Sequence, residues 1–126
     1  MARTGRFADS YLTELLNKIL NNNHYLALFN ADPFSVSTPT TVEIVSPVYA
    51  RQVPTFSLSG RLLTCTIPLT WNGIAQGGVV SHIGSFSTPF GSVLEWAGPV
   101  PGGPYSFPNG GYLTVPVNSY LVGIDT

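Results

Sequence analysis

The chain begins with a helical pattern of apolar residues. Between Phe7 and Leu20, apolar side chains recur at intervals of three and four, the spacing that lines one face of an α-helix. The positions are Ala8, Tyr11, Leu12, Leu15, Leu16 and Ile19. The helix should end at the run Asn21-Asn22-Asn23, because asparagine side chains compete with the helical backbone and tolerate the left-handed cap. We expect the apolar face to pack on the chain's own sheet, with docking on a neighbouring chain as the alternative.

The rest of the chain shows the pattern of β-strands separated by proline and glycine, with no second helical period. Between Leu62 and Ile67, apolar residues alternate with polar ones, which indicates a sheet with one solvent-exposed face. The run Tyr25 to Phe29 is apolar on both faces, so this strand should be central or covered. Short strands are predicted at Tyr25 to Asn30, Thr41 to Val45, Thr55 to Ser59, Leu62 to Ile67, Val79 to Phe86, Ser92 to Ala97, Tyr112 to Val117 and Ser119 to Ile124.

Together these elements predict a mainly β fold, in which the N-terminal helix packs on an antiparallel β-sandwich of about eight short strands. Residues 1–23 would form the N-terminal arm and helix, and residues 24–126 the sandwich. A chain of 126 residues is of the usual size for one folding unit. Pro54, Pro68 and Pro116 should lie at sheet edges, strand ends or bulges, because proline has no N–H to donate.

The segment from Gly98 to Gly111 is so rich in proline and glycine that we expect a long connection without regular structure. It carries two aromatic residues, Tyr105 and Phe107. One interpretation is that they anchor a partner, because a loop stiffened by proline loses little entropy on docking. The other is that they fold back over the open end of the sandwich.

Charged residues are scarce. They make up 9 % of the chain, against about 25 % in an average soluble domain. Such a surface has little electrostatic repulsion, which favours self-association or docking over a monomer coated in polar, uncharged residues. The net charge of −1 with scattered basic residues leaves no basic stripe for nucleic acid.

No membrane-spanning or targeting segment is expected. No run approaches the roughly 20 apolar residues that cross a bilayer. Asp9, Glu14 and Lys18 interrupt any signal-peptide core, so we expect folding in a cytoplasm.

The residues that could perform chemistry are few and isolated. Neighbouring strand residues point to opposite faces, so Ser81 is not expected to meet the side chain of His82. His24 is expected to cap or hydrate the asparagine turn. A single cysteine, Cys65, with two distant histidines gives no metal-ligand pattern, and its place in an alternating strand predicts a buried thiol. We therefore expect no enzyme, no catalytic residue, no metal and no cofactor.

Exposed aromatics beside amides are typical of sugar-binding sandwiches, and Trp71-Asn72 and the stretch Tyr105 to Asn109 supply both. The alternative is that Trp71 and Trp96 fill the core of the sandwich.

Four features follow one another along the chain: the N-terminal helix and three short motifs. The motifs are Tyr25-Leu26-Ala27-Leu28-Phe29-Asn30-Ala31-Asp32-Pro33, then Tyr49-Ala50-Arg51-Gln52, then Val80-Ser81-His82-Ile83-Gly84-Ser85-Phe86. In this order they resemble a group of small tailed-bacteriophage virion proteins, often labelled tail-fibre or minor structural proteins. The final Leu121-Val122-Gly123-Ile124-Asp125 resembles the closing strand of that group. The stretch from Pro99 to Gly111 departs from it, being longer and richer in proline.

The resemblance implies a structural component of a tailed-phage virion. The chain has no internal repeats, which a fibre shaft usually shows. We therefore expect a capsid decoration or minor capsid protein that docks on the assembled shell and stabilises it. The alternatives are a tail or tail-fibre-associated protein and a carbohydrate-binding module for host attachment. The expected partners are copies of itself, as a trimer or other small oligomer, and major capsid or tail subunits, and the expected location is the virion.

Arg51 lies in the second of these motifs, between two prolines, and has two possible roles. It could anchor its loop by binding carbonyl groups or a carboxylate such as that of Glu43, or it could contact a neighbouring subunit. The candidate interaction surface predicted from the sequence consists of Tyr105, Phe107, Trp71 and Arg51.

Overall fold

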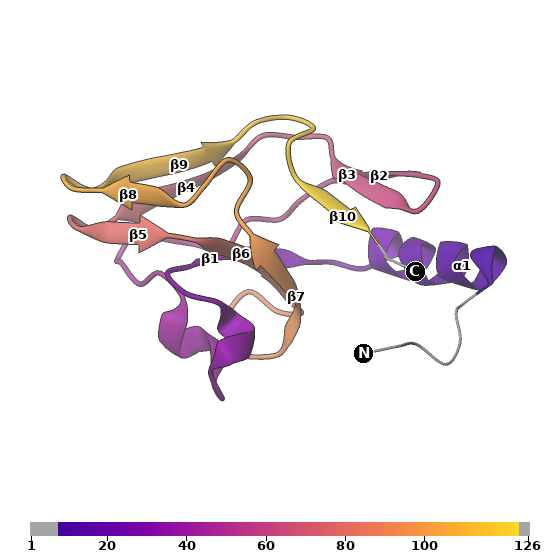
Figure 1. The fold of residues 1–126 in the computed structure, drawn as a ribbon, viewed down its shortest axis with the longest axis horizontal. Helices are drawn as coiled ribbons and strands as arrows, with labels where there is room; N and C mark the ends of the chain where they lie inside the picture. Colours follow the sequence, from indigo (N-terminus) through magenta and orange to yellow (C-terminus); the bar gives the residue numbers. More distant parts are fainter. Residues whose placement is uncertain (1–7, 124–126) are drawn as a thin grey trace.

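The computed structural model describes residues 8–123, and in this range the fold is mainly β with one N-terminal helix, as predicted (Figure 1). The helix, α1, spans Asp9–Asn21. Two 3₁₀ helices, η1 (Pro33–Ser35) and η2 (Pro39–Val42), follow the first strand. The strands are β1 (Tyr25–Phe29), β2 (Phe56–Ser59), β3 (Leu62–Cys65), β4 (Leu69–Ile74), β5 (Gly78–Val80), β6 (His82–Phe86), β7 (Leu94–Pro99), β8 (Tyr105–Phe107), β9 (Gly111–Val115) and β10 (Leu121–Gly123).

The centre of the fold is one long antiparallel ribbon. Its first arm runs through β3, β4, β5 and β6 (residues 62–86), and its second arm runs back through β7, β8, β9 and β10 (residues 94–123). The two arms pair along their length: β3 with β10, β4 with β9, β5 with β8 and β6 with β7. The register runs from Leu62 opposite Gly123 to Phe86 opposite Leu94, so residues 87–93 form the hairpin loop.

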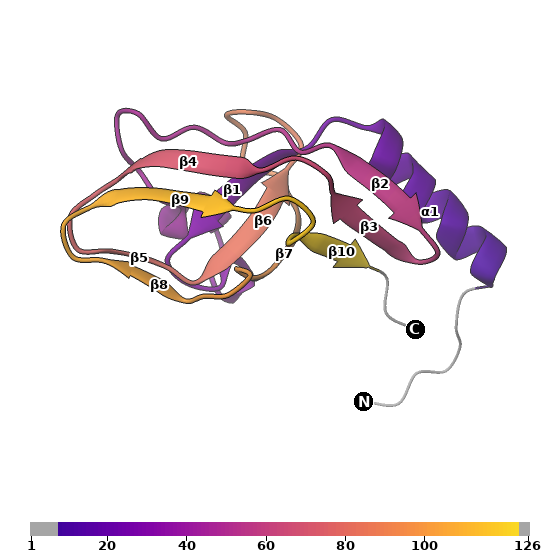
Figure 2. The same ribbon diagram turned by 90° about the horizontal axis from the view of Figure 1, so that it is seen from above.

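This ribbon is folded in half, and the two halves are the two layers of the sandwich. Both arms turn at the same end of the molecule, after β4 and after β8 (Figure 2). Gly77 and Gly110 stand at these turns with φ of 79° and 74°, values that glycine adopts without the strain of a side chain. The N–H groups of both glycines donate to the carbonyl of Phe107, at 2.7 and 3.1 Å. Trp71, Val80, Ile83 and other apolar side chains are buried between the layers.

Two further strands complete the layers. β1 pairs with the outer side of β6, and β2 pairs with the outer side of β3. The other edge of β1 is covered by the irregular segment 42–52. The backbones of Leu26 and Gln52 exchange hydrogen bonds of 2.7 and 2.9 Å, and the N–H of Ile44 donates to the carbonyl of Leu28 at 2.9 Å. Residues Leu26 to Phe29 are fully buried, which confirms that this strand is covered.

The helix packs on β2 and β3, so its apolar face lies on the chain's own sheet, as expected. Leu12 and Leu16 are fully buried. The helix ends at Asn21, within the predicted asparagine run, but the cap residue Asn22 is extended (φ −101°) and not left-handed. Phe7, where the helix was predicted to begin, and Ile124, where the last strand was predicted to end, lie outside the described residues.

Three predicted segments differ in the structure. Thr41 to Val45 is not a strand: η2 begins at Pro39, whose fixed φ suits a first helical turn, and only an isolated bridge at Glu43 remains. The predicted strand Val79 to Phe86 is divided at Ser81 into β5 and β6. The segment Gly98 to Gly111 is not a single irregular loop, because it contains β8, which pairs with β5.

β4 was not predicted from the sequence. Leu69–Ile74 lies directly after Pro68 and contains Gly73, two residues that usually interrupt a strand. Its ladder with β9 is irregular between Trp71 and Ile74, where Gly73 has a φ of 75°. Pro68 immediately precedes β4 and Pro116 immediately follows β9, so both lie at strand ends, as predicted.

Candidate interaction surface

Arg51 lies in a nearly buried ion pair. Its Nε and Nη2 donate to the two carboxylate oxygens of Glu43 at 2.9 and 2.8 Å, and Nη1 donates to the carbonyl of Thr88 at 3.0 Å. The guanidinium carbon lies 3.7 Å from the centre of the Phe86 ring. The Arg51 and Glu43 side chains are only 6 % and 10 % exposed. The structure therefore shows the internal role for Arg51, with the carboxylate partner that was predicted.

Tyr49 connects this ion pair to the core. Its hydroxyl donates to Glu43 Oε2 at 2.8 Å and accepts the N–H of Leu28, in β1, at 3.0 Å. Burial, reinforced by the negative charge of Glu43, raises the pKa of Tyr49 well above its usual range. Segment 42–52 is thereby fixed on the edge of β1 by side chains as well as by its backbone.

Trp71 is part of the core. Its ring is fully buried, and Nε1–H donates to the carbonyl of Leu26 at 3.0 Å. This bond joins β4 in one layer to β1 in the other. The interpretation of Trp71 as a core residue is confirmed, and the suggestion that it offers an exposed face to a sugar or partner is wrong.

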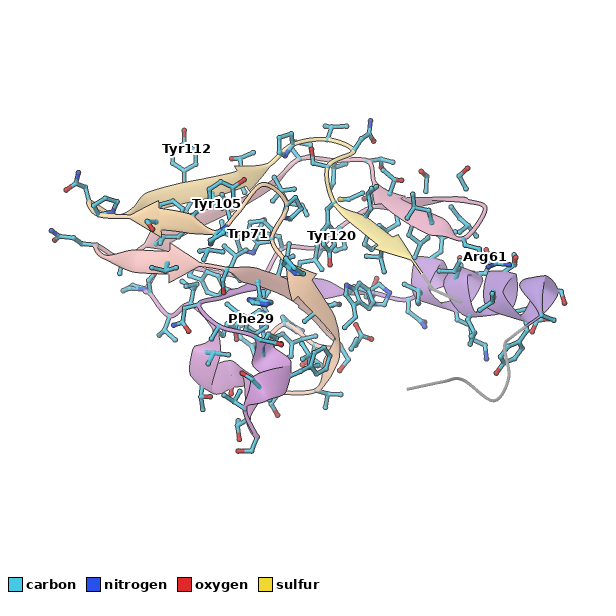
Figure 3. All side chains as sticks on the ribbon, in the orientation of Figure 1. Phe29, Arg61, Trp71, Tyr105, Tyr112 and Tyr120 are labelled. Carbon is cyan, nitrogen blue, oxygen red and sulfur yellow. The ribbon has the colours of Figure 1, made fainter. Side chains whose placement is uncertain are left out.

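Tyr105 and Phe107 belong to β8 and are partly buried against the main core cluster. The Tyr105 hydroxyl donates to the carbonyl of Pro101 at 2.7 Å, so the side chain stabilises the turn between β7 and β8. Trp71 belongs to the same core cluster, and Figure 3 labels both side chains. Of the two interpretations of these aromatics, the structure fits the one in which they cover the sandwich.

The side chains of Ser81 and His82 do meet, contrary to the prediction. Ser81 lies between β5 and β6, so the alternation of faces fails there, and its Oγ lies 2.8 Å from His82 Nδ1. Within residues 8–123, no carboxylate forms a hydrogen bond with His82 that would complete a catalytic triad. The contact therefore has the character of a local hydrogen bond at a break in the strand.

His24 does more than cap a turn. Its Nε2 contacts the carbonyl of Ile19 in the last turn of α1, and its Nδ1 lies 2.8 Å from Glu95 Oε1, which also accepts the hydroxyl of Ser85 at 2.8 Å. The imidazole is buried and packs on the ring of Trp96, with centroids 4.8 Å apart. These contacts join the end of α1 to β6 and β7.

Three further features of the described residues concern a thiol, metal ligands and membrane insertion. Cys65 is buried, as predicted. Residues 8–123 contain no group of three His, Cys, Asp or Glu side chains placed to hold a metal ion. In the same range, no helix has the length and apolar character required to cross a membrane.

The most exposed large apolar side chain in residues 8–123 is one that sequence analysis did not select. Phe90 is 95 % exposed in the hairpin loop 87–93. The N–H of Gly91 donates to Thr88 Oγ1 at 2.7 Å and the N–H of Ser87 donates to the carbonyl of Val93 at 3.2 Å, so the loop is braced. The sequence signal was the turn Pro89-Phe90-Gly91, which places an aromatic residue at a hairpin tip.

Phe90 borders a groove of about 590 Å³. The groove lies between the hairpin loop and segment 42–52, and its lining includes Glu43, Tyr49, Arg51 and the 82 %-exposed Val45. We name this groove, with Phe90 and Val45, the Phe90 surface. Its two charged side chains neutralise each other through their ion pair, so the groove offers apolar contact with no net charge.

Comparisons with known proteins identify no relative: no family model, no curated protein and no solved structure matches the chain.

Proposed function

We propose that this chain is a structural subunit that docks on a larger assembly through the Phe90 surface, and that the assembly is a tailed-phage virion. The observation that carries the docking role is the almost complete exposure of Phe90 beside a neutral groove. The phage context rests on the resemblance of the motifs at residues 25–33, 49–52 and 80–86 to small virion proteins.

The energetics of Phe90 support docking. Burying an exposed phenylalanine contributes about 1.5–3 kcal/mol, and aromatic anchors dominate many interfaces. The braced loop reduces the conformational entropy that docking would otherwise cost. The ion pair beneath it forms hydrogen bonds within the chain, so a partner does not have to satisfy two separate buried charges.

On the particle, we propose a capsid position, as a decoration or minor capsid protein. A compact domain without repeats is suited to covering contacts between other subunits, and by binding only the assembled shell it stabilises that state through mass action. A tail position is the alternative. The sugar-binding hypothesis has lost its main candidate, because Trp71 is fully buried.

The test compares labelled protein and two variants for co-sedimentation with purified virions that lack it. Phe90→Ser should weaken binding by about tenfold or more, as expected for loss of an aromatic anchor. Val79→Ser, at an exposed position on β5, serves as the control and should bind like the wild type. Imaging of the label then assigns capsid or tail.

Restoring the protein should also raise the heat resistance of the virions. If Phe90→Ser bound as tightly as the wild type, the Phe90 surface would not be the docking site. If the protein were absent from purified virions and did not bind them, the virion function itself would be refuted.

A further inference from the structure

The outer edge of the second arm carries no strand. Among residues 8–123, β7, β8, β9 and β10 each pair with a single strand, and in every case that strand belongs to the first arm. No backbone hydrogen bond joins β9 to a described residue outside β4. One whole side of the sandwich therefore ends in strand edges with free backbone groups.

The opposite side is covered only in part. The edge of β1 is covered by segment 42–52 through backbone hydrogen bonds, and α1 packs against β2. The outer side of the first arm has β1 on β6 and β2 on β3, and only its middle strands, β4 and β5, have no second partner. The bare edge of the second arm differs because, among residues 8–123, no strand covers any part of it.

The bare edge also lacks the usual chemical protection. Proteins commonly guard free edges with lysine or other charges, because an unpaired edge is a template for another strand. From Trp96 to Gly123 the second arm contains no Asp, Glu, Lys or Arg. Proline is present, but it lies at strand ends and in the connections, so β9 is a five-residue edge without proline or charge.

We propose that a second copy of this chain pairs with this edge, β9 against β9 in antiparallel orientation. Antiparallel pairing of one edge with itself is self-complementary, so a single two-fold contact satisfies both copies at once. An edge with no charge adds no repulsion when two identical copies meet. Pairing would continue the β4–β9 layer across the two-fold axis into the second protomer.

Tyr112 is the side chain that such pairing would cover. It lies on β9, is 66 % exposed, and points away from the body of the protein in Figure 3. In an antiparallel pair the Tyr112 rings would lie near the exposed Thr114 of the other copy, as cross-strand neighbours. Pairing at β9 does not use Phe90, so this inference goes beyond the proposed docking role and can fail without it.

The experiment is sedimentation equilibrium of the full chain from micromolar to millimolar concentration. The wild type should show a monomer–dimer equilibrium. Tyr112→Lys places like charges near the two-fold axis and should raise the dimer dissociation constant by about tenfold or more. Val93→Lys is the matched control: it has the same 66 % exposure but lies in the hairpin loop, and it should dimerise like the wild type.

A second measurement covers the case in which Tyr112→Lys does not fold. In the wild type, the backbone amides of β9 should exchange hydrogen more slowly at high than at low protein concentration, whereas those of loop 87–93 should not change. A monomer at every concentration, an oligomer unaffected by Tyr112→Lys, or concentration-independent exchange in β9 would each overturn the proposal. None of these results would bear on binding through Phe90.

Discussion

Replacing Arg51 with methionine tests the importance of the ion pair most directly. Arg51→Met removes the two bonds to Glu43, the bond to the Thr88 carbonyl and the cation over the Phe86 ring, but keeps most of the apolar volume. The Glu43 carboxylate would then be left nearly buried, with the Tyr49 hydroxyl as its remaining hydrogen-bond donor.

The expected cost is large. Leaving one partner of a buried pair uncompensated typically destabilises a protein by about 3–5 kcal/mol, which is a substantial part of the 5–15 kcal/mol that a domain of this kind has. An exposed pair would contribute only about 0–1 kcal/mol. Because the two side chains are only 6 % and 10 % exposed, this pair behaves as a buried pair.

Urea unfolding followed by tryptophan fluorescence measures the effect. Arg61→Met, the same substitution at an exposed position in the turn between β2 and β3, is the control and should change the free energy of unfolding by less than about 1 kcal/mol. The double variant Glu43→Gln with Arg51→Met should be destabilised by less than the sum of the two single variants, because no uncompensated charge remains. A loss below about 1 kcal/mol for Arg51→Met would refute the assignment of a buried, stabilising pair.

Two further predictions concern the core. Burial raises the pKa of both Tyr49 and Tyr120 above the usual value of about 10, so the unfolded chain releases these protons at lower pH than the folded chain. The free energy of unfolding should therefore fall as pH rises above about 10. A spectrophotometric titration in which all tyrosines of the folded protein ionise together near that pH would contradict this. Trp71→Phe removes the indole bond to the Leu26 carbonyl, which still accepts the N–H of Gln52. The lost bond should cost about 0.5–1.5 kcal/mol in urea unfolding, and an unchanged stability would be the contrary result.

Local sequence was sufficient where an element forms from its own pattern. The periodicity of Leu12 and Leu16 predicted α1, and the two-sided apolar run of β1 predicted its burial. The ion pair of Arg51 with Glu43 was also predictable, because the two residues are close in sequence and share one irregular segment.

Local sequence failed where pairing between distant residues decides the structure. β8 forms because β5 offers it an edge, although proline and glycine surround it. β4 forms against β9 in spite of Pro68 and Gly73. The contact of His24 with Glu95 spans 71 positions, so no spacing rule could have indicated it. Phe90 was missed for a related reason, since its exposure depends on how the hairpin loop lies on the folded ribbon.

The internal pairs explain why the surface is even poorer in charge than the composition implies. Three charged side chains bind partners within the chain: Glu43, Arg51 and Glu95. The second arm carries no charged residue from Trp96 to Gly123. Long-range electrostatic steering therefore contributes little to an encounter with another protein. Recognition at the two proposed surfaces, the Phe90 surface and the β9 edge, would instead depend on apolar burial, backbone pairing and shape. These interactions act only at contact, which suits the proposed role of a subunit with fixed neighbours in an assembly.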